Sequence, residues 1–546
     1  MYATILAAAC ISMPYALLGK NDNPALVVQI TADQLRGDLL DRYRSALNDG
    51  LARIEDGGYW IHQGQVDHGV TVSFPGHATL ATGMYPSHHG LTANEWWQNQ
   101  KGMWGEVDVV ADDRFTLLDE PLRRGVSAHN MTATTLGEWL KASSRHSKSV
   151  VLGTGNTIPV AYAGSRSDAV YWYDSLSGHF TSSTFYSTST KPWVAAFNAD
   201  RLPKYQPHVW ALTVPLSLLG LANPDATSYE NHGRHNTFPH DYATESTLDA
   251  RAGIPATYSR WFASTPMKDE ALLGLAAEAV DAEQLGQRGV TDYLAIDIDS
   301  TDAVGHEYGP LSLEQLDTLV RLDHALGRFL EHLDAMVGEG NYVLVFSADH
   351  GVTTPPEAGG GGRRVTSSEI ESILDRVDTI AGVASGSRAT LVERIVAALK
   401  QVDFIADAYS ETRLASASAD PYVQLYQRVF RKGFTTNFPL WGQKVHLHHP
   451  ARYGIIVRFK ENMVIDAATG IHGSPYAADR LVPIIFYGKN ILIGTRIAGG
   501  RTVDVAPTLA AAAGIQAPRT LDGVVLQSIV QKAALSRSMS SSARGK

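Results

Sequence analysis

Aspartate and histidine residues follow several short apolar segments of the chain, at the point where each segment ends. The segments and the residues that follow them are Ala25–Ile30 with Asp33, Tyr293–Ile298 with Asp302 and His306, and Tyr342–Phe346 with Asp349 and His350. His472 differs, because its segment Gly470–Tyr476 precedes the apolar run Val482–Tyr487. Carboxylates and imidazoles are the usual ligands of catalytic zinc, which keeps an open position for substrate. Three Asp and three His could hold two metal ions with three protein ligands each.

Each member of this set has an ordinary structural alternative. An aspartate at a strand end often caps a helix, and Asp302 and His306, four residues apart, could form a salt pair on one helix. The histidines His446, His448 and His449 could imitate a metal cluster, but we interpret them as a surface patch. The metal hypothesis therefore rests on the set as a whole.

Ser73 is the candidate nucleophile. It lies in the run Thr71–Thr79, where Pro75 suits the first turn of a helix and so places Ser73 near a helix N-terminus. Free amides and the helix dipole at that end favour an alkoxide and a bound phosphoryl group. A plain helix cap is the alternative, and the hydroxyls of Thr71 and Thr79 compete for the same role.

The pattern of strands and helices that must position these residues predicts an α/β fold with a mostly parallel sheet. Apolar strand candidates alternate with helices and lack a polar face, as expected for strands covered on both sides. The other strand candidates are Ser149–Gly153 and Tyr453–Phe459. The clearest helix spans about Leu313–Val337, and Ser312 and Gln315 can form its capping box. Ligands gather at the carboxyl ends of parallel strands, so the strand-end residues could meet at one rim.

Composition limits the classes of function. The 546 residues carry a formal net charge of −10, which argues against a nonspecific nucleic-acid-binding surface. The one cysteine, Cys10, excludes an intramolecular disulfide, so any zinc must be held by His, Asp and Glu.

The chain is organised as one catalytic domain with insertions. Residues 1–19 contain an apolar stretch that resembles a secretory signal with an atypical start, and we expect a periplasmic or secreted protein. The catalytic domain is predicted over 25–530, with insertions at about 198–264 and 355–449 whose aromatic residues could wall the pocket. A disordered tail is predicted over 534–546, and apart from the N-terminal segment no stretch is long and apolar enough to span a bilayer.

An ordered set of motifs resembles the alkaline phosphatase superfamily, in its branch of type I phosphodiesterases/nucleotide pyrophosphatases and bacterial alkaline phosphatases with a single-residue nucleophile. The motifs are Ser73-Phe-Pro-Gly-His77 followed by Ala81-Thr-Gly-Met-Tyr-Pro86, Asp302-Ala-Val-Gly-His306, Ser347-Ala-Asp349-His350-Gly, His472-Gly-Ser-Pro-Tyr and Asp504-Val-Ala-Pro-Thr508. The resemblance spans about Ala25 to Leu526 and implies an alkaline-phosphatase-like α/β/α sandwich with cap insertions. Most relatives carry Thr where this chain has Ser73.

The resemblance also implies roles for the motif residues. One zinc ion would be held by Asp302, His306 and His472, and the other by Asp33, Asp349, His350 and Ser73, with Mn²⁺ or Co²⁺ as possible substitutes. Ser73 would attack phosphorus to form a phosphoseryl intermediate, and Asn94 would donate a hydrogen bond to the phosphoryl group. The substrate would be a small-molecule phosphate ester.

One departure bears on the substrate. Counted back from Ala169–Asp174, the Lys-Asp-Arg triplet of the monoesterase branch is replaced by Gly155-Asn156-Thr157. Each lost charge-assisted contact would cost a monoester dianion about 1.5–3 kcal/mol and a diester less. We therefore expect a phosphodiesterase, unless Arg166 supplies the charge.

The alternatives are an alkaline phosphatase or a phosphonate monoester hydrolase and, more remotely, a catalytically inactive binding protein. His77 stands where a sulfatase motif has Arg, which disfavours a sulfatase. A cofactor-independent phosphoglycerate mutase would share the metals but would have no reason to be exported.

Overall fold

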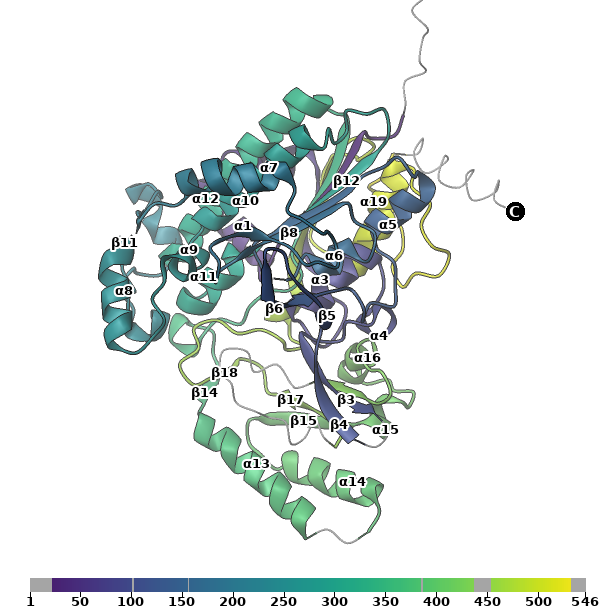
Figure 1. Cartoon of the computed structure of the whole chain (residues 1–546). Coiled ribbons are helices and arrows are strands. Elements are labelled where there is room, and N and C mark those ends of the chain that lie inside the picture. The colour runs from purple at the N-terminus through teal and green to yellow at the C-terminus, as the bar shows by residue number, and fades with distance from the viewer. Residues whose placement is uncertain (1–21, 101–102, 156, 384–385, 437–452, 532–546) are drawn as a thin grey trace, which may run out of the picture.

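The computed structural model describes residues 22–100, 103–155, 157–383, 386–436 and 453–531 (Figure 1). The predicted signal segment, the three histidines of the expected surface patch and the predicted disordered tail lie outside these residues. Within the described part of the chain, none of the helices combines the length and the apolar character needed to cross a bilayer.

A nine-stranded sheet forms the centre of the molecule, in the order β20-β2-β19-β13-β1-β12-β7-β8-β9. Its strands are β20 (Gly494–Arg496), β2 (Tyr59–Gln65), β19 (Leu481–Gly488), β13 (Tyr342–Ser347), β1 (Leu26–Ala32), β12 (Asp292–Ile298), β7 (Ser149–Gly153), β8 (Ala169–Asp174) and β9 (His179–Thr181). The run β13-β1-β12-β7-β8 is parallel, whereas β19 and β9 pair with their neighbours in the antiparallel sense. The predicted mostly parallel sheet is confirmed.

Helices cover both faces of this sheet because its strands are apolar on both sides. On β1, Leu26, Val28 and Ile30 pack into one core cluster, whereas Val27 packs into the other. The first cluster includes residues of α1 (Asp38–Tyr43), α2 (Gly50–Gly57), α7 (Pro192–Ala196), α10 (Met267–Ala282), α11 (Ser300–Tyr308) and α12 (Leu313–Leu333). The second includes residues of α3 (Ser73–Thr82), α5 (Leu136–Ser143), α6 (Val160–Ala163) and α19 (Val505–Ala513). Figure 1 shows α10 and α12 on one side of the sheet and α5 and α19 on the other, so the α/β/α sandwich is confirmed.

The predicted helix over Leu313–Val337 corresponds to α12, with a final turn of another type over Asp334–Gly338. Half of the predicted capping box is present: the Ser312 side chain accepts a hydrogen bond of 3.0 Å from the Gln315 N–H. The reciprocal bond is absent, since Gln315 Oε1 makes no hydrogen bond.

A carboxylate on α12 also caps a neighbouring helix. Asp323 is fully buried, and its oxygens accept from the N–H groups of Asn48 and Asp49, at 2.8 and 2.9 Å, and of Leu51, at 2.7 Å. These N–H groups lie at the start of α2, where no other helical carbonyl can accept them. Asp323 thereby joins α2 to α12 beneath the sheet.

We expect Asp323→Ala to lower the free energy of unfolding by about 3 kcal/mol, because buried N–H groups lose their acceptor and a helix N-terminus loses its anion. Urea denaturation of the two proteins measures the difference. Glu331→Ala is the control, since Glu331 is exposed on the same helix and should change stability by less than about 0.5 kcal/mol. Equal unfolding midpoints for Asp323→Ala and the wild type would contradict the capping role.

The predicted strand Tyr453–Phe459 forms, as β17 (Ile455–Phe459), but it does not join the central sheet. It pairs with β15 (Ile405–Ser410) in the 355–449 region, which has a small core of its own. The region also contains β14 (Arg363–Val365), α13 (Ser367–Gly382), α14 (Arg388–Leu399), α15 (Glu411–Leu414), α16 (Pro421–Gln427) and β16 (Phe434–Thr436). β18 (Met463–Ile465), which follows the region in the sequence, pairs with β14. An apolar run alone predicts a strand without naming its partner, which explains the wrong placement.

The 198–264 region packs against α11 and α12. It contains β10 (Val209–Trp210), β11 (His240–Asp241), α8 (Tyr242–Arg251) and α9 (Tyr258–Ala263). Trp210 Nε1 donates to Asp317 at 2.7 Å, and His240 Nε2 lies 3.3 Å from Glu314. Trp210 is thus a core residue.

The chain between α3 and α5 adds two hairpins. They consist of β3 (Glu95–Gln100) with β4 (Met103–Asp108) and of β5 (Ala111–Leu117) with β6 (Glu120–Val126). β16 extends the first hairpin to three strands. The short helices α4 (Pro86–His89) and α18 (Ala477–Arg480) complete the described elements that flank the site.

Candidate active site

The strand-end residues meet because their strands are neighbours. β13, β1 and β12 lie side by side and parallel, with Thr31 of β1 opposite Asp297 of β12 and Ser347 of β13. The segments that follow these three strands therefore leave the sheet at one rim. All six sequence-predicted ligands lie there, in three overlapping groups of potential metal-binding side chains.

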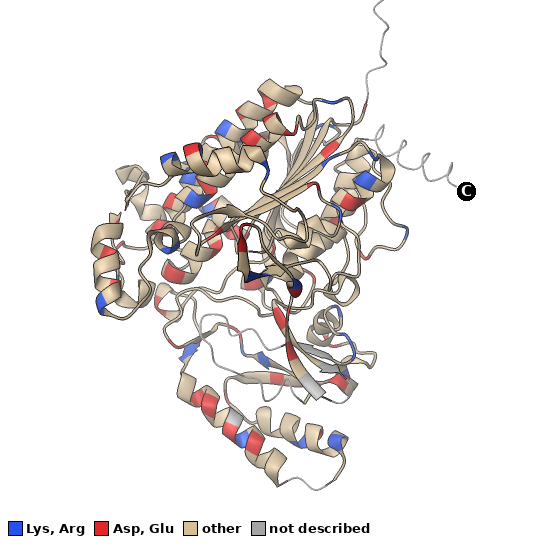
Figure 2. Ribbon diagram, viewed as in Figure 1, with Lys and Arg blue, Asp and Glu red and all other residues tan. Residues whose placement is uncertain are grey.

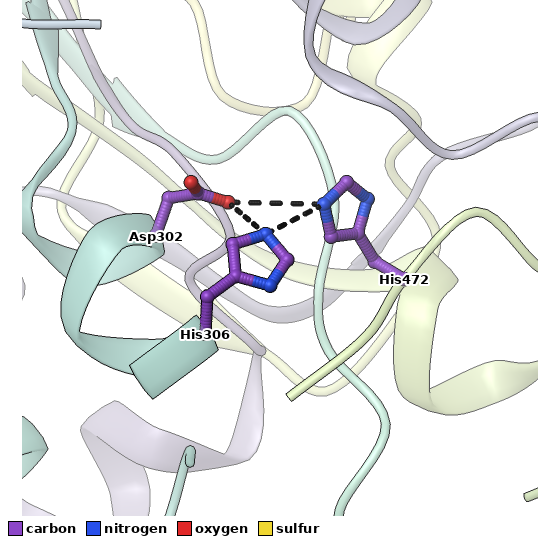
Figure 3. A group of neighbouring side chains, drawn as sticks. All are labelled: Asp302, His306 and His472. Carbon is purple, nitrogen blue, oxygen red and sulfur yellow. Dashed lines mark hydrogen bonds and ion pairs between the residues drawn. The ribbon is translucent and has the colours of Figure 1, made fainter. Parts of the chain in front are cut away.

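Asp302, His306 and His472 form the first group (Figure 3). Asp302 Oδ1 lies 3.2 Å from His306 Nε2 and 3.8 Å from His472 Nε2, and the two imidazole nitrogens are 3.2 Å apart. Asp302 and His306 are one turn apart on α11, whereas His472 comes from the loop between β18 and α18. The third side chain makes this a three-ligand cluster rather than a salt pair within one helix.

Asp33, Asp349 and His350 lie beside it. His350 Nε2 is 3.3 Å from Asp33 Oδ1 and 3.2 Å from Asp349 Oδ2. Ligand atoms of Asp33, Asp302 and His350 also lie within 4.8 Å of one another, which brings the second group next to the first. The two groups together form one cluster, as two neighbouring metal ions would need.

The outer nitrogen of each imidazole is held by a backbone carbonyl. The Nδ1 atoms of His306, His350 and His472 lie 2.7, 3.0 and 2.8 Å from the carbonyl oxygens of Gly470, Gly351 and Thr71, respectively. This contact fixes the tautomer, so Nε2 is the acceptor and points into the cluster. Metal-binding histidines are oriented in this way.

Buried ligand atoms without hydrogen-bond partners show that the cluster suits a cation. Asp33 Oδ1, Asp349 Oδ2 and His350 Nε2 make no hydrogen bond, although all three residues are almost completely buried. Unsatisfied buried polar atoms are costly and point to a ligand. The donor set of carboxylate oxygens and imidazole nitrogens fits a divalent metal ion such as zinc.

The charges of the cluster lead to the same conclusion. Burial, together with the carboxylates of Asp349 and Asp302, raises the pKa of Asp33 well above its usual range. Burial also lowers the pKa of His472 well below its usual value, while Asp302 outweighs burial at His306 and raises its pKa to about 9. Bound cations would favour the ionised carboxylates and the neutral imidazoles that metal binding requires.

Ser73 is the first residue of α3, as the sequence predicts, and it faces a cavity of about 370 Å³ beside the cluster. The competing hydroxyls are fully buried and committed to carbonyl oxygens: Thr71 Oγ1 donates to Ser474 at 2.8 Å, and Thr79 Oγ1 to Pro75 at 2.7 Å. Ser73 is therefore the hydroxyl of this segment that lines the cavity.

The start of α3 lies against the end of β13. A Cβ atom at Gly76 would lie 2.5 Å from the carbonyl oxygen of Asp349, so only glycine permits this approach. Asn94 joins the same point from the other side, because its Oδ1 accepts a hydrogen bond of 3.0 Å from the Phe74 N–H. The Nδ2 hydrogens of Asn94 remain to donate to a group bound next to Ser73.

Two residues at this rim were missed by the sequence analysis as parts of the site. Gln34 has a positive φ of 63°, and its Nε2 donates to Asp302 Oδ1 at 2.5 Å while its N–H donates to Asp349 at 3.1 Å. His77 is fully buried between Asp297, at 2.9 Å, and Asp349, at 3.2 Å. A glutamine gives no sign in the sequence that it contacts metal ligands. Gln34 nevertheless follows Asp33 directly, and this position brings it between Asp302 and Asp349.

The cavity walls differ from those expected. The residues that line it are Asp33, Ser73, Phe74, Asn94, Glu95, Asp108, Val109, Thr157, Ile158, Asp299, Asp302, His306 and His472. Within the described ranges none of them comes from the 198–264 or 355–449 region, so the expectation that these insertions wall the pocket is wrong there. The first hairpin and the loop after β7 wall it instead.

One residue of the Gly155-Asn156-Thr157 segment reaches the cavity. Thr157 lines it, and Gly155 lies against Asp297, whose Oδ2 accepts from the Gly155 N–H at 3.2 Å. Arg166 is exposed and is not among the lining residues. Where the chain is described, the cavity therefore has no lysine or arginine in its wall.

Comparisons with known proteins identify the family of the chain. Residues 27–361 match the family model of type I phosphodiesterase/nucleotide pyrophosphatase. The chain is 34% identical over 340 residues to alkaline phosphatase PhoV of Synechococcus elongatus, covering 61% of this chain and 60% of PhoV. It is 26% identical to alkaline phosphatase PafA of Elizabethkingia meningoseptica, covering 93% of this chain and 94% of PafA.

The fold agrees as well. The crystal structure of wild-type PafA superposes with a TM-score of 0.81 at 24% identity, covering 93% of this chain and 99% of that one. The predicted alkaline-phosphatase-like architecture is confirmed by this similarity. The chain thus belongs to the type I phosphodiesterase/nucleotide pyrophosphatase family, within the alkaline phosphatase superfamily of phosphoester hydrolases.

Proposed function

We propose that the chain is a metal-dependent phosphatase of the alkaline phosphatase type, which hydrolyses phosphate monoesters through a phosphoseryl intermediate on Ser73. The observation that supports this most is the position of Ser73 in one cavity with two adjoining groups of Asp and His side chains. The names of PhoV and PafA favour this activity over the diesterase preference that the sequence alone suggested.

In this proposal the first group holds one zinc ion through Asp302, His306 and His472. The second holds another through Asp33, Asp349, His350 and the Ser73 hydroxyl. Bound zinc supplies positive charge to the phosphoryl oxygens and lowers the pKa of the serine hydroxyl.

The side chains of the protein bind and position the substrate around this centre. Ser73 Oγ forms a bond to phosphorus as the bond from phosphorus to the alcohol oxygen breaks, and the alcohol leaves with a proton from solvent. Water then releases phosphate and restores the hydroxyl. The Nδ2 of Asn94 donates to a non-bridging oxygen, and the N-terminus of α3 faces the developing negative charge.

A phosphodiesterase is the second candidate, and the wall of the cavity is the observation that favours it. Thr157, which the count along the sequence matches to the Arg of the monoesterase triplet, lines the cavity, and the described wall contains no Lys or Arg. A diester monoanion has one charge fewer than a monoester dianion, and so loses less from the missing contacts.

The ratio of kcat/KM on p-nitrophenyl phosphate to that on bis-p-nitrophenyl phosphate tests the proposal. We expect a preference for the monoester, and we expect hydrolysis of both substrates to be lost on treatment with a chelator. A diester preference would overturn the monoesterase assignment and support the second candidate, and chelator-resistant hydrolysis of both would contradict the metal site.

We expect Thr157→Arg to raise the monoester-to-diester ratio by about tenfold, because a guanidinium in the cavity wall would contact the second negative charge of a monoester. The measurement is the same pair of kcat/KM values. Gly155→Lys is not an equivalent test, since a Cβ atom there would lie 2.8 Å from Asp297 Oδ2. An unchanged ratio in Thr157→Arg would show that this wall does not face the phosphate.

A further inference from the structure

A carboxylate of the cavity wall lies against the segment that the sequence matches to the monoesterase triplet. Asp299 lines the cavity together with Thr157. A Cβ atom at Gly155 would lie 3.1 Å from Asp299 Oδ1, so this oxygen lies directly beside the path of any side chain at position 155. The wall therefore carries a carboxylate beside the positions at which the monoesterase branch has two cations.

The partner of this carboxylate is a buried lysine. Lys268 is on α10, forms an ion pair with Asp299 and has a side chain that is 3% exposed. Burial lowers the pKa of Lys268, but the carboxylates of Asp299 and Asp269 outweigh it and raise the pKa above its ordinary value. Lys268 is therefore an ammonium ion that lies behind the wall, and it is not among the residues that line the cavity.

Hydrogen bonds from neighbouring residues hold the two partners in place. The Asp269 carboxylate accepts from the Ser300 N–H at 2.8 Å and from Thr154 Oγ1 at 2.5 Å. It thereby joins the start of α10 to the start of α11 and to the residue before Gly155. The Asp299 N–H also donates to Thr154 Oγ1, at 3.2 Å. The ion pair is thus a fixed part of the wall.

The other carboxylate next to Gly155 has different partners. Asp297 is fully buried, its Oδ1 lies 2.9 Å from His77 Nε2, and it does not line the cavity. The outer surface on this side carries both signs of charge, since Figure 2 shows acidic and basic residues interspersed along the helices around α10. The charge that a substrate meets beside Thr157 is therefore set by Asp299 and its partner Lys268.

We propose that the Asp299–Lys268 pair sets the preference of the enzyme between phosphate monoesters and phosphate diesters. The proposal rests on the phosphoester hydrolase function proposed above and identifies a specificity-determining pair for it. Asp299 opposes the second negative charge of a bound monoester, and Lys268 cancels part of this opposition through the wall. A diester has one charge fewer, so both residues affect it less.

Variants without one of the two charges test this in the zinc-loaded full-length enzyme, through kcat/KM on p-nitrophenyl phosphate and bis-p-nitrophenyl phosphate. Burial raises the pKa of Asp299 to about 7, so the assays are made at a pH of about 9, where the carboxylate is charged. We expect Asp299→Asn to raise the monoester-to-diester ratio by about tenfold and Lys268→Met to lower it by about threefold. The carboxylate has the larger effect because it lines the cavity, whereas the ammonium group lies behind it.

A double variant and a matched control complete the test. The double variant Asp299→Asn/Lys268→Met should have a ratio between those of the single variants, about threefold above wild type, because the two effects on the substrate add. If Lys268→Met alone does not fold, the comparison of the double variant with Asp299→Asn measures the effect of the lysine instead. Glu278→Gln is the control, because Glu278 is on α10, pairs with Arg201 at 2.6 Å and does not line the cavity. This control should keep the wild-type ratio.

The direction of the two shifts separates the possible outcomes. Opposite shifts for the removal of Asp299 and of Lys268 would support the proposal, because a loss of structure alone lowers both activities without this reversal of sign. Shifts in the same direction, or a ratio that neither removal changes, would overturn the specificity inference while leaving the hydrolase function intact. A wild-type enzyme that hydrolyses neither substrate would overturn the hydrolase function and the inference with it.

Discussion

Ser73→Ala is expected to lower kcat/KM by about 10⁴-fold or more, while the protein still folds and binds metal. The variant lacks the only hydroxyl of the Thr71–Thr79 segment that faces the cavity, so no phosphoseryl intermediate can form at that position. Initial rates on p-nitrophenyl phosphate and the metal content per chain measure the two parts of this prediction. The metal should remain, because the six Asp and His side chains are unchanged.

Two controls bracket the result. Ser73→Thr keeps a hydroxyl at the same place and should retain turnover within about tenfold. Thr71→Val removes a nearby hydroxyl and keeps the shape of the side chain. It should retain turnover as well, because the Thr71 hydroxyl donates to the Ser474 carbonyl and does not face the substrate. High activity in Ser73→Ala combined with loss of activity in Thr71→Val would show that Thr71, and not Ser73, is the nucleophile.

The second large effect is expected for Asp302→Ala, which should lose at least one metal ion per chain and lower kcat/KM by about 10³-fold or more. Asp302 is a ligand of the first group and lies beside the second, since its carboxylate is close to His306 and to Asp33. Its removal leaves the first group with two imidazoles and takes an anion from the immediate neighbourhood of the second. Elemental analysis and initial rates with added zinc measure the effect.

Glu307→Gln is the control for this variant, because Glu307 lies on the same helix α11 and does not line the catalytic cavity. It should keep both metal content and rate. An Asp302→Ala protein that binds a full complement of metal would contradict the ligand assignment, as would a wild-type rate.

Much of the site could be predicted from the sequence because its residues follow strands directly. Asp33, Asp302 and Asp349 are within a few residues of buried apolar runs, and parallel strands send the segments that follow them to one rim. These residues could be predicted because they lie close in sequence to strands that the hydrophobic pattern defines. His472 was less secure by this argument, since it lies on a loop, and the motif resemblance identified it.

The remaining features depend on tertiary contacts that the pattern does not encode. Glu95 and Asp108 line the cavity and are brought together by the pairing of β3 with β4. No periodicity in that hairpin indicates which of its residues face the cavity. Gln34 becomes important through a left-handed backbone conformation that a glutamine rarely adopts. The strand Ile455–Phe459 was placed in the wrong sheet for the same reason, because its apolar run fits any buried partner.

The residue that carries phosphate during turnover tests the central claim most directly. The zinc-loaded enzyme would be mixed with p-nitrophenyl phosphate, quenched in acid and digested, and the phosphopeptides identified by mass spectrometry. We predict a phosphoserine at Ser73 that is absent from Ser73→Ala and from enzyme treated with a chelator before mixing. Phosphate on another residue, or rapid turnover with no phosphate on the protein, would contradict the account.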